Sequence, residues 1–394
     1  MVLTSTKQLV DAGRVARFAE SLPVSGKAVW NRHGGFGSTR PPAFFGQTRA
    51  VPLQKLSSTD AFVVIDLDGA SHADGLVRWA KKVLVDGART MARSRTYAWA
   101  LLGEQVSGAS AGISAAPDGR ADAISAFVAE VAPQVASGVL ALDPGKGIGP
   151  DDLAPVADTD TRSPMLHSPT PTGTLADALL AAGIAAAAGA ALGGLDGRTV
   201  AIEGAGRAGP ALIEAFAGRG ARVTAIGTSA GTLVVRDDAD TEELGASWAE
   251  HGDGLAGALG SELSASAVLR HEADVLVCGS KLGLVDHDVA AALPHRVVAP
   301  CGPAPVTARG LAVAHGRDIV VLADFLTTAG PLLAFRPADD ATVGALLAAA
   351  VDTVGGLTID VMGHEEGAYL GACYRAEEFL LTWQDALPFG RPLA

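Results

Sequence analysis

The sequence predicts a two-domain α/β protein whose second half is a Rossmann-type, doubly wound parallel sheet. The chain has 394 residues, too many for one ordinary core, and it is 48% hydrophobic and 19% charged. Short apolar, β-branched runs recur in the second half and are separated by helical stretches, which is typical of a parallel sheet with helices on both faces. The first of these runs leads into a G-x-G-x-x-G motif at Gly204, Gly206 and Gly209.

The first half alternates predicted strands and helices. The apolar spacing from Leu76 through Val83 to Ala92 predicts one long helix over residues 74–102. Glycine and proline mark residues 30–46 as a loop. The other elements expected here are a strand at 61–68, a helix at 121–136 that ends near Pro133, a strand at 138–149 that runs into a glycine-rich loop, and a short helix opened by Pro150.

In the second half, an Ala-rich helix leads to a break at Gly193 and Gly194. Its apolar stretch, 175–195, is long enough to cross a membrane, but it is mostly Ala and Gly, contains Asp177 and has no basic flank, so we expect a buried core helix. The predicted strands are 198–204, 221–229, 273–279, 295–300 and 318–324, with a helix at 206–220 and helical sequence at 341–388. We therefore expect a Rossmann domain over residues 169–340 and a substrate and oligomerisation domain over 1–168 plus about 341–394.

The net charge, the cysteines and the N-terminal segment limit the kinds of molecule that the protein is expected to bind. The net charge of −13 argues against nucleic acid, because phosphate binding needs a basic surface. The three cysteines, Cys278, Cys301 and Cys373, show no C-x-x-C spacing, and the N-terminus lacks the apolar core of a signal peptide. We expect a cytoplasmic protein that acts on a small molecule without a membrane, nucleic acid or metal site.

The glycine motif has the context that gives it meaning, because it follows a strand and opens a helix. There the glycines allow a tight turn, and the helix N-terminus favours a pyrophosphate; a simple glycine-rich turn is the alternative. The second strand ends at Thr228 and Ser229 with no acid for the ribose, so both NAD and NADP stay open. The cofactor contacts expected from this region are Gly204, Gly206, Arg207, Ala208, Gly209, Thr228 and Ser229.

Several segments resemble the glutamate/leucine/phenylalanine/valine dehydrogenase family. LDGRTVAIEGAGRAG is similar to its "LxGKTVAIQGFGNVG", ADVLVCGSKLG to "DILxPCALG", and DIVVLADFLTTAG to "IxxxPDFLxNAGG". SPTPTGTLADALLAA resembles the start of its "ATGxGV" helix, and MARSRTYAWA echoes the first domain. The resemblance implies reversible NAD(P)-dependent oxidative deamination in a cleft between two domains, within a homo-oligomer. It adds Thr172, Gly279, Ser280 and Thr328 to the expected cofactor contacts.

The sequence departs from this family at the positions that carry its chemistry. The lysine that grips the substrate carboxylate falls on Ala98, the catalytic lysine of "GGGK" on Ser110, and the aspartate of "PDxG" on Gly145. Serine replaces lysine neither as a cation nor, without a partner, as a base. Ordinary amino-acid deamination is therefore not expected.

Other side chains are candidates to replace these groups. Lys281 follows the strand expected near the nicotinamide, Lys146 lies beside Gly145, and His167 lies in the interdomain connection. Each also has an ordinary interpretation, as a loop lysine, a surface lysine and a hinge histidine. Arg78 is a candidate for a substrate anion, although an arginine on a helix surface is the usual case, and Asp324 is expected to end a strand.

Two hypotheses follow. The first is an NAD(P)-dependent oxidoreductase with altered chemistry, such as imine or ketone reduction in specialised biosynthesis. The second is a non-catalytic nucleotide-binding relative, a scaffold or regulatory subunit. Lys281 distinguishes them, because an ammonium that points away from the cleft would deprive the enzyme hypothesis of its best candidate.

Overall fold

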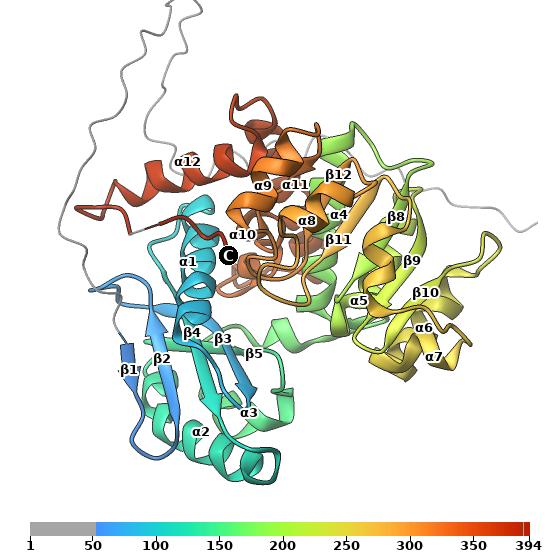
Figure 1. The fold of residues 1–394 in the computed structure, drawn as a ribbon. Helices are drawn as coiled ribbons and strands as arrows, with labels where there is room; N and C mark the ends of the chain where they lie inside the picture. Colours follow the sequence, from blue (N-terminus) through green and yellow to red (C-terminus); the bar gives the residue numbers. More distant parts are fainter. Residues whose placement is uncertain (1–52, 389) are drawn as a thin grey trace, which may run out of the picture. The chain divides into compact units, whose positions relative to one another are not determined.

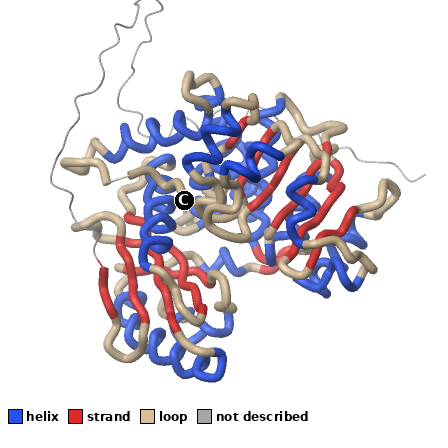
Figure 2. Tube along the Cα trace, in the orientation of Figure 1, coloured by secondary structure: helices blue, strands red, loops and turns tan. Residues whose placement is uncertain are grey.

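A computed structural model describes residues 53–388 and 390–394, and these residues form one compact unit. The loop expected at 30–46 and the N-terminal segment lie outside the described residues. Two separate groups of strands form the two main sheets, with helices between and around them (Figures 1 and 2). This arrangement confirms the predicted α/β class.

The first sheet has the strand order β1-β2-β4-β3-β5. Its centre is parallel, since β3 runs parallel to β4 and β5, and β2 adds antiparallel to β4. Helix α1 packs on one face through Ala88 and Ala92, whereas α2 and α3 pack on the other through Phe127 and Leu153. The elements are β1 (Leu53–Lys55), β2 (Ala61–Ile65), β3 (Ala73–Ala80), α1 (Val85–Leu101), β4 (Ser107–Ser114), α2 (Arg120–Ala136), β5 (Leu140–Pro144) and α3 (Pro150–Ala157).

The helix predicted over residues 74–102 is wrong in its first third. Residues 73–80 form strand β3, which lies between β4 and β5 and pairs with both. Apolar residues spaced three and four apart fit a helix locally, but the long-range pairing of a central strand overrides that preference. Arg78 therefore lies on a strand and not on a helix surface.

Strand β4 has no obvious strand signal, because its sequence SGASAGIS is made of small residues. The reason is close packing against α1. A Cβ atom added at Gly108 would lie 1.8 Å from the carbonyl oxygen of Ala92, and Gly108 donates its amide hydrogen to Thr96 Oγ1 at 2.8 Å. Small side chains let the helix backbone approach the sheet.

The second sheet has the order β10-β9-β8-β11-β12-β13. It is parallel from β9 to β13, as predicted, and only the edge strand β10 is antiparallel. Its strands are β8 (Thr199–Glu203), β9 (Arg222–Thr228), β10 (Gly231–Val234), β11 (Val275–Cys278), β12 (Val297–Pro300) and β13 (Val320–Val321). Its helices are α4 (Leu175–Leu192), α5 (Gly209–Ala217), α6 (Thr241–His251), α7 (Leu255–Ala258), α8 (His287–Ala292), α9 (Ala308–His315) and α10 (Asp324–Thr327).

Helix α4 is the expected Ala-rich helix. It begins with a capping box between Thr174 and Asp177, after the short pairing of β6 (Pro169–Thr170) with β7 (Gly173–Thr174), and ends at Gly193 in the left-handed conformation. By length and composition, α4 and α11 (Val343–Met362) could each cross a membrane. However, α4 packs against α5, α11 and β12, as a core helix does.

The C-terminal helical region is divided into two helices. Helix α11 packs on α4, and α12 (Ala368–Leu380) packs on α1 of the first sheet (Figure 1). The strand predicted to end at Asp324 ends instead at Val321, and Asp324 is the first residue of α10. Asp324 is therefore buried at the start of a helix and takes no part in strand pairing.

Candidate functional site

The glycine motif forms the turn between β8 and α5. Gly204 and Gly206 have φ angles of +68° and +54°, which favour glycine. A Cβ atom at Gly204 would lie 2.7 Å from the backbone of Ser280, whereas nothing lies within 4 Å of one at Gly206. The turn therefore packs tightly on the loop after β11 and leaves open space on the side where a pyrophosphate would approach.

The turn continues into a short 3-10 helix, η4 (Gly206–Ala208), and then α5. Arg207 is exposed, while Ala208 and Gly209 are buried. The ring of Trp248 lies so close to Gly209 that an added Cβ atom would be 2.3 Å from it. The third glycine is thus required for packing of α6 against α5.

The two residues after β11 are already bonded within the protein. Glu203, buried at the end of β8, accepts hydrogen bonds from the amides of Gly279 and Ser280 at 3.1 and 3.2 Å. These expected cofactor residues therefore support the glycine turn. Thr172, another expected contact, donates from Oγ1 to Glu214 on α5 at 2.8 Å.

An acid that is distant in the sequence, Asp253, lies at the end of β9. Ser229 Oγ donates to Asp253 Oδ2 at 2.5 Å, and Thr228 Oγ1 donates to the carbonyl of Asp253 at 2.6 Å. Asp253 belongs to η5 (Gly252–Gly254), which packs against η4 of the glycine turn. It is 24 residues from Ser229 in the sequence, so only the fold brings it to the strand end.

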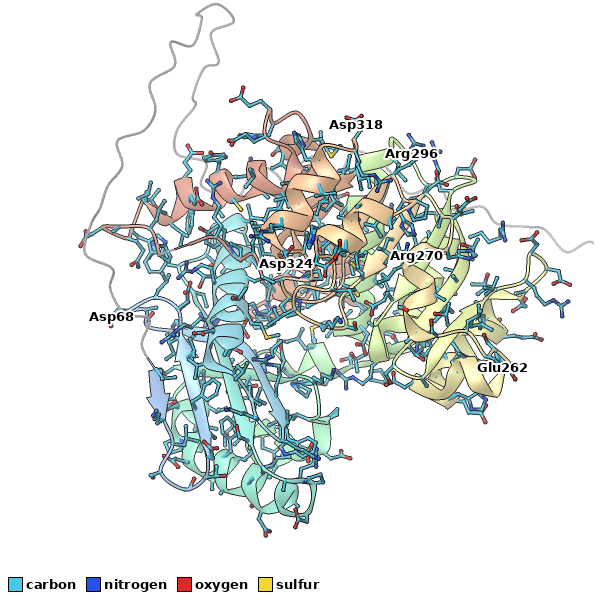
Figure 3. All side chains as sticks on the ribbon, in the orientation of Figure 1. Asp68, Glu262, Arg270, Arg296, Asp318 and Asp324 are labelled. Carbon is cyan, nitrogen blue, oxygen red and sulfur yellow. The ribbon has the colours of Figure 1, made fainter. Side chains whose placement is uncertain are left out.

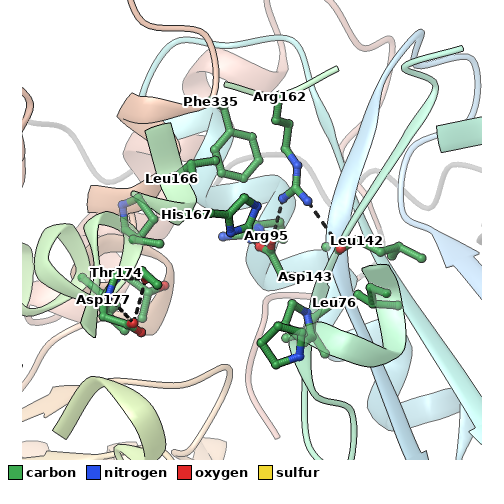
Figure 4. A pocket seen from close by; sticks show the side chains of 18 of the residues that line it. Leu76, Arg95, Leu142, Asp143, Arg162, Leu166, His167, Thr174, Asp177 and Phe335 are labelled. Carbon is green, nitrogen blue, oxygen red and sulfur yellow. Dashed lines mark hydrogen bonds and ion pairs between the residues drawn. The ribbon is translucent and has the colours of Figure 1, made fainter. Parts of the chain in front are cut away.

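A cavity of about 700 Å³ lies between the two sheets (Figure 4). Its wall includes Leu76 and Leu142 of the first sheet, Met91 of α1, and Pro331 and Phe335. Most of this wall is apolar, as in sites for small organic ligands. The cavity also reaches the glycine turn, because Arg207 lines it.

The cavity gathers only some of the residues predicted from the sequence. Ala98 on α1, His167 in η3 (Pro164–His167), Arg207, and Thr328 after α10 line it. The remaining candidates do not line it. Among the expected catalytic and substrate residues these are Lys281, Lys146, Ser110, Arg78 and Gly145, and among the expected cofactor contacts they are Gly204, Gly206, Ala208, Gly209, Thr172, Thr228, Ser229, Gly279 and Ser280. Lys281 and Lys146 are both exposed. A role of either lysine in catalysis stays a prediction.

Two arginines that the sequence did not single out lie in the cavity wall, and both are paired. Arg95 Nε lies 2.6 Å from Asp74, and Arg95 Nη2 lies 2.9 Å from Asp143. Arg162 lies 2.5 Å from Asp143 and 2.6 Å from Asp160, and it stacks over Phe335 with 5.0 Å between guanidinium and ring centre. Figure 4 shows Arg162 directed at Asp143 from beside Phe335.

The acids of this cluster have opposite pKa shifts. Burial raises the pKa of Asp74 to about 6, although Arg95 acts against it. Burial acts in the same direction on Asp143, but the positive charges of Arg162 and Arg95 outweigh it and lower the pKa of Asp143. Arg162 is therefore committed to charges of the protein and is not free for a substrate carboxylate.

Arg78 and Ser110 lie on β3 and β4 outside the cavity. Arg78 Nε and Nη2 are buried and, among the described residues, have no hydrogen-bond partner; burial lowers the pKa of Arg78. Its side chain lies beside Gly145, where an added Cβ atom would be 3.0 Å from Arg78 Cγ. Ser110 is fully buried, and its Oγ has no partner in the described part of the chain, so no base activates it.

Asp324 connects the two halves. It is fully buried, and Figure 3 shows it inside the fold, whereas Glu262 and Asp318 lie at the periphery. It accepts hydrogen bonds from Ser94 Oγ of α1 at 2.5 Å and from the amide of Ala304 at 2.8 Å. Burial raises the pKa of Asp324. The carboxyl group of Asp324 therefore connects α1 to the loop that follows β12 of the second sheet.

One protein-family model matches the part of the chain that carries the glycine turn. The model of the Glutamate/Leucine/Phenylalanine/Valine dehydrogenases matches residues 177–334, from the first turn of α4 to η7 (Gly330–Ala334), so the match contains the glycine turn and one wall of the cavity. This segment of the chain is similar to the Glutamate/Leucine/Phenylalanine/Valine dehydrogenases, and over these residues the family resemblance found in the sequence is confirmed.

Relatives within this family match over part of their length. The NADP-specific glutamate dehydrogenase A1 of Halobacterium salinarum is 33% identical over 138 residues, which cover 34% of this chain and 33% of that protein. A glutamate dehydrogenase of Aeropyrum pernix is 26% identical over 142 residues, 36% of this chain and 34% of its own. The match thus spans about a third of the length of these dehydrogenases.

Solved structures of dehydrogenases share the fold over more of the chain. A hetero-hexameric glutamate dehydrogenase from Thermus thermophilus has a TM-score of 0.65 and 22% identity, covering 81% of this chain and 83% of that one. An L-tryptophan dehydrogenase from Nostoc punctiforme has a TM-score of 0.56 and 15% identity, covering 86% and 97%. At these identities the likeness establishes a common fold.

Proposed function

We propose that this protein is an NAD(P)-dependent oxidoreductase that acts on an apolar ketone or imine without a free carboxylate. One observation carries the proposal: within the described part of the chain, no lysine lines the cavity, and of the three arginines that line it, Arg95 and Arg162 are ion-paired while Arg207 lies in the glycine turn. A substrate carboxylate buried beside the first sheet, away from that turn, would lack a compensating cation, which is costly.

The glycine turn supports the cofactor. Its positive φ angles, the open space beside Gly206 and the exposed guanidinium of Arg207 suit a dinucleotide pyrophosphate. When bound, the nicotinamide supplies or accepts the hydride. The halobacterial relative is named as NADP-specific, and the family resemblance is compatible with either NAD or NADP.

The chain's own residues would then bind the substrate and move a proton. The apolar wall around Leu142, Met91 and Phe335 would hold the substrate and exclude water. Reduction of a carbonyl or imine carbon leaves the oxygen or nitrogen in need of a proton. His167 lines the cavity, and its imidazole has a ring nitrogen that can donate a hydrogen bond or a proton.

A titration of NADH and NADPH fluorescence tests cofactor binding. We expect binding of at least one dinucleotide and a loss of about tenfold in affinity for Arg207→Ala, as for one charge-assisted contact. Arg309→Ala is the matched control, because Arg309 is an exposed arginine on α9 outside the cavity. If neither dinucleotide binds at millimolar concentration, the proposed function is wrong.

Steady-state assays of NAD(P)H consumption test the substrate class. Apolar ketones and cyclic imines should be reduced, whereas glutamate, leucine, phenylalanine and valine should not be oxidised. Robust turnover of any of these amino acids would contradict the lost-lysine assignment at Ala98 and Ser110.

A non-catalytic nucleotide-binding protein is the second candidate. It is favoured by the exposed position of Lys281 and by the buried hydroxyl of Ser110, which has no hydrogen-bond partner among the described residues. Dinucleotide binding without turnover on the carbonyl and imine panel would support it. We further propose that the protein acts in the cytoplasm as a homo-oligomer, with the domain limits expected from the sequence.

A further inference from the structure

We infer that Asp253 is the residue that selects NAD over NADP, by binding the adenosine ribose and repelling a 2′-phosphate. The inference rests on the proposed dinucleotide site and names a specificity residue for it. A dinucleotide-binding Rossmann domain places the ribose beside the end of its second strand, where an acid accepts hydrogen bonds from the hydroxyls. Here that strand is β9, and its last residues carry no acid.

The contacts place the carboxylate of Asp253 at this strand end. Gly204 donates its amide hydrogen to the carbonyl of Gly227 at 3.0 Å, so the glycine turn lies directly beside the end of β9. The next two residues, Thr228 and Ser229, both bond to Asp253, one to its carbonyl and the other to its carboxylate. The acid is thus fixed next to the turn by two hydroxyl groups.

The carboxylate has capacity for a ligand. Asp253 is exposed, and the contact with Ser229 uses Oδ2. A carboxylate can accept about four hydrogen bonds, so Oδ1 can accept from a ribose hydroxyl. With the 2′-phosphate of NADP, the same oxygen would instead meet a like charge, which opposes binding.

The arginines of the β9–β10 hairpin lie beside the start of β9, at the opposite end of the strand from Asp253, and do not offset that repulsion. Arg236 is paired with Asp238 at 2.6 Å, and Arg222 is paired with Asp237 at 2.5 Å. Their guanidinium charges are therefore matched by carboxylates already. An NADP site needs a cation that can turn to the phosphate, whereas this edge presents an acid.

The test compares the dissociation constants of NADH and NADPH for three proteins by fluorescence titration. The wild type should bind NADH about tenfold or more tightly than NADPH, the size of one charged hydrogen bond. Asp253→Asn should weaken NADH binding and bring the ratio of the two constants close to one. Glu250→Gln is the control, since it removes an exposed negative charge on the neighbouring helix α6 and should leave the ratio unchanged.

The outcomes separate this inference from the proposed function. Equal or tighter NADPH binding by the wild type, or an unchanged ratio in Asp253→Asn, overturns the role of Asp253 while the dinucleotide site stands. An equal change in Glu250→Gln also overturns it, because the effect would then come from general charge. Failure of the wild type to bind either dinucleotide overturns both claims.

Discussion

At the scale of single residues, Asp74 shows how burial and charge compete behind the cavity wall, where it pairs with Arg95. Its Oδ2 accepts a hydrogen bond from Trp99 Nε1 at 3.1 Å and pairs with Arg95, whereas Oδ1 is buried without a hydrogen-bond partner among the described residues. The pKa of about 6 means that the carboxyl holds its proton more tightly in the folded than in the unfolded chain.

This shift predicts a pH dependence of stability. Because the folded state has the higher pKa, the contribution of Asp74 is fully present below about pH 4 and is lost as the pH rises to about 6. Over that window, the free energy of unfolding of the wild type should fall relative to that of Asp74→Asn by up to about 1.4 kcal/mol per pH unit. Urea unfolding of both proteins at several pH values measures the difference in slope.

Asp151→Asn is the control for this comparison, because Asp151 is an exposed acid of the cavity wall. The variant Asp74→Asn also loses the ion pair with Arg95. That loss changes the free energy of unfolding of the variant, but it does not cause the predicted fall of the wild-type free energy with rising pH. Parallel curves for the wild type and Asp74→Asn would refute the assigned pKa shift.

At the scale of elements, the turn between β8 and α5 depends on glycine for two separate reasons. Gly204 has a positive φ angle, and its α-carbon lies against the loop after β11. The same loop is held to β8 by Glu203. The turn is therefore rigid before any ligand binds, which lowers the entropy lost on binding.

We predict that Gly204→Ala destabilises the fold by about 3 kcal/mol, from backbone strain and overpacking together. An added methyl group would lie 2.4 Å from Ser280 Cβ and 2.7 Å from its backbone, so the loop would have to move. Chemical denaturation measures the loss. Gly257→Ala on α7 is the control: nothing lies within 4 Å of its added methyl group, so it should be neutral or slightly stabilising. Equal stabilities of the two variants would show that the close approach is not present in solution.

At the scale of the whole molecule, the C-terminal helices leave apolar surface uncovered. Helix α11 contains an 18-residue window with a mean hydropathy of 1.6, yet only 33% of that window is buried. Ile359 on this helix is 66% exposed and Val343 is 38% exposed. An apolar helix with so little cover suits a contact with a second copy of the chain.

We therefore predict a homo-oligomer in which α11 is at an interface. Light scattering on the purified protein should give a multiple of the chain mass, and Ile359→Glu should reduce it. Leu263→Glu, at a 47% exposed leucine before η6 (Ala265–Arg270), should leave the mass unchanged. A wild-type monomer at micromolar concentration would exclude this assembly.

The sequence by itself determined the parallel sheet and the glycine turn, whereas the loss of the family's lysines at Ala98 and Ser110 stays a prediction from the resemblance. These features depend on short-range pattern, because a glycine motif between a strand and a helix has the same local meaning in any fold of this class. Helices with clear caps, such as α4 with Thr174 and Asp177, were predictable for the same reason.

Only the tertiary structure decided which side chains share the site. It made residues 73–80 a central strand, paired Arg95 and Arg162 with acids of the cavity wall, left Lys281 exposed, and placed Asp253 beside Ser229. These facts depend on pairing and charge contacts between residues far apart in the chain. A single sequence contains no signal for such contacts, since their energy arises only when folding brings the groups together.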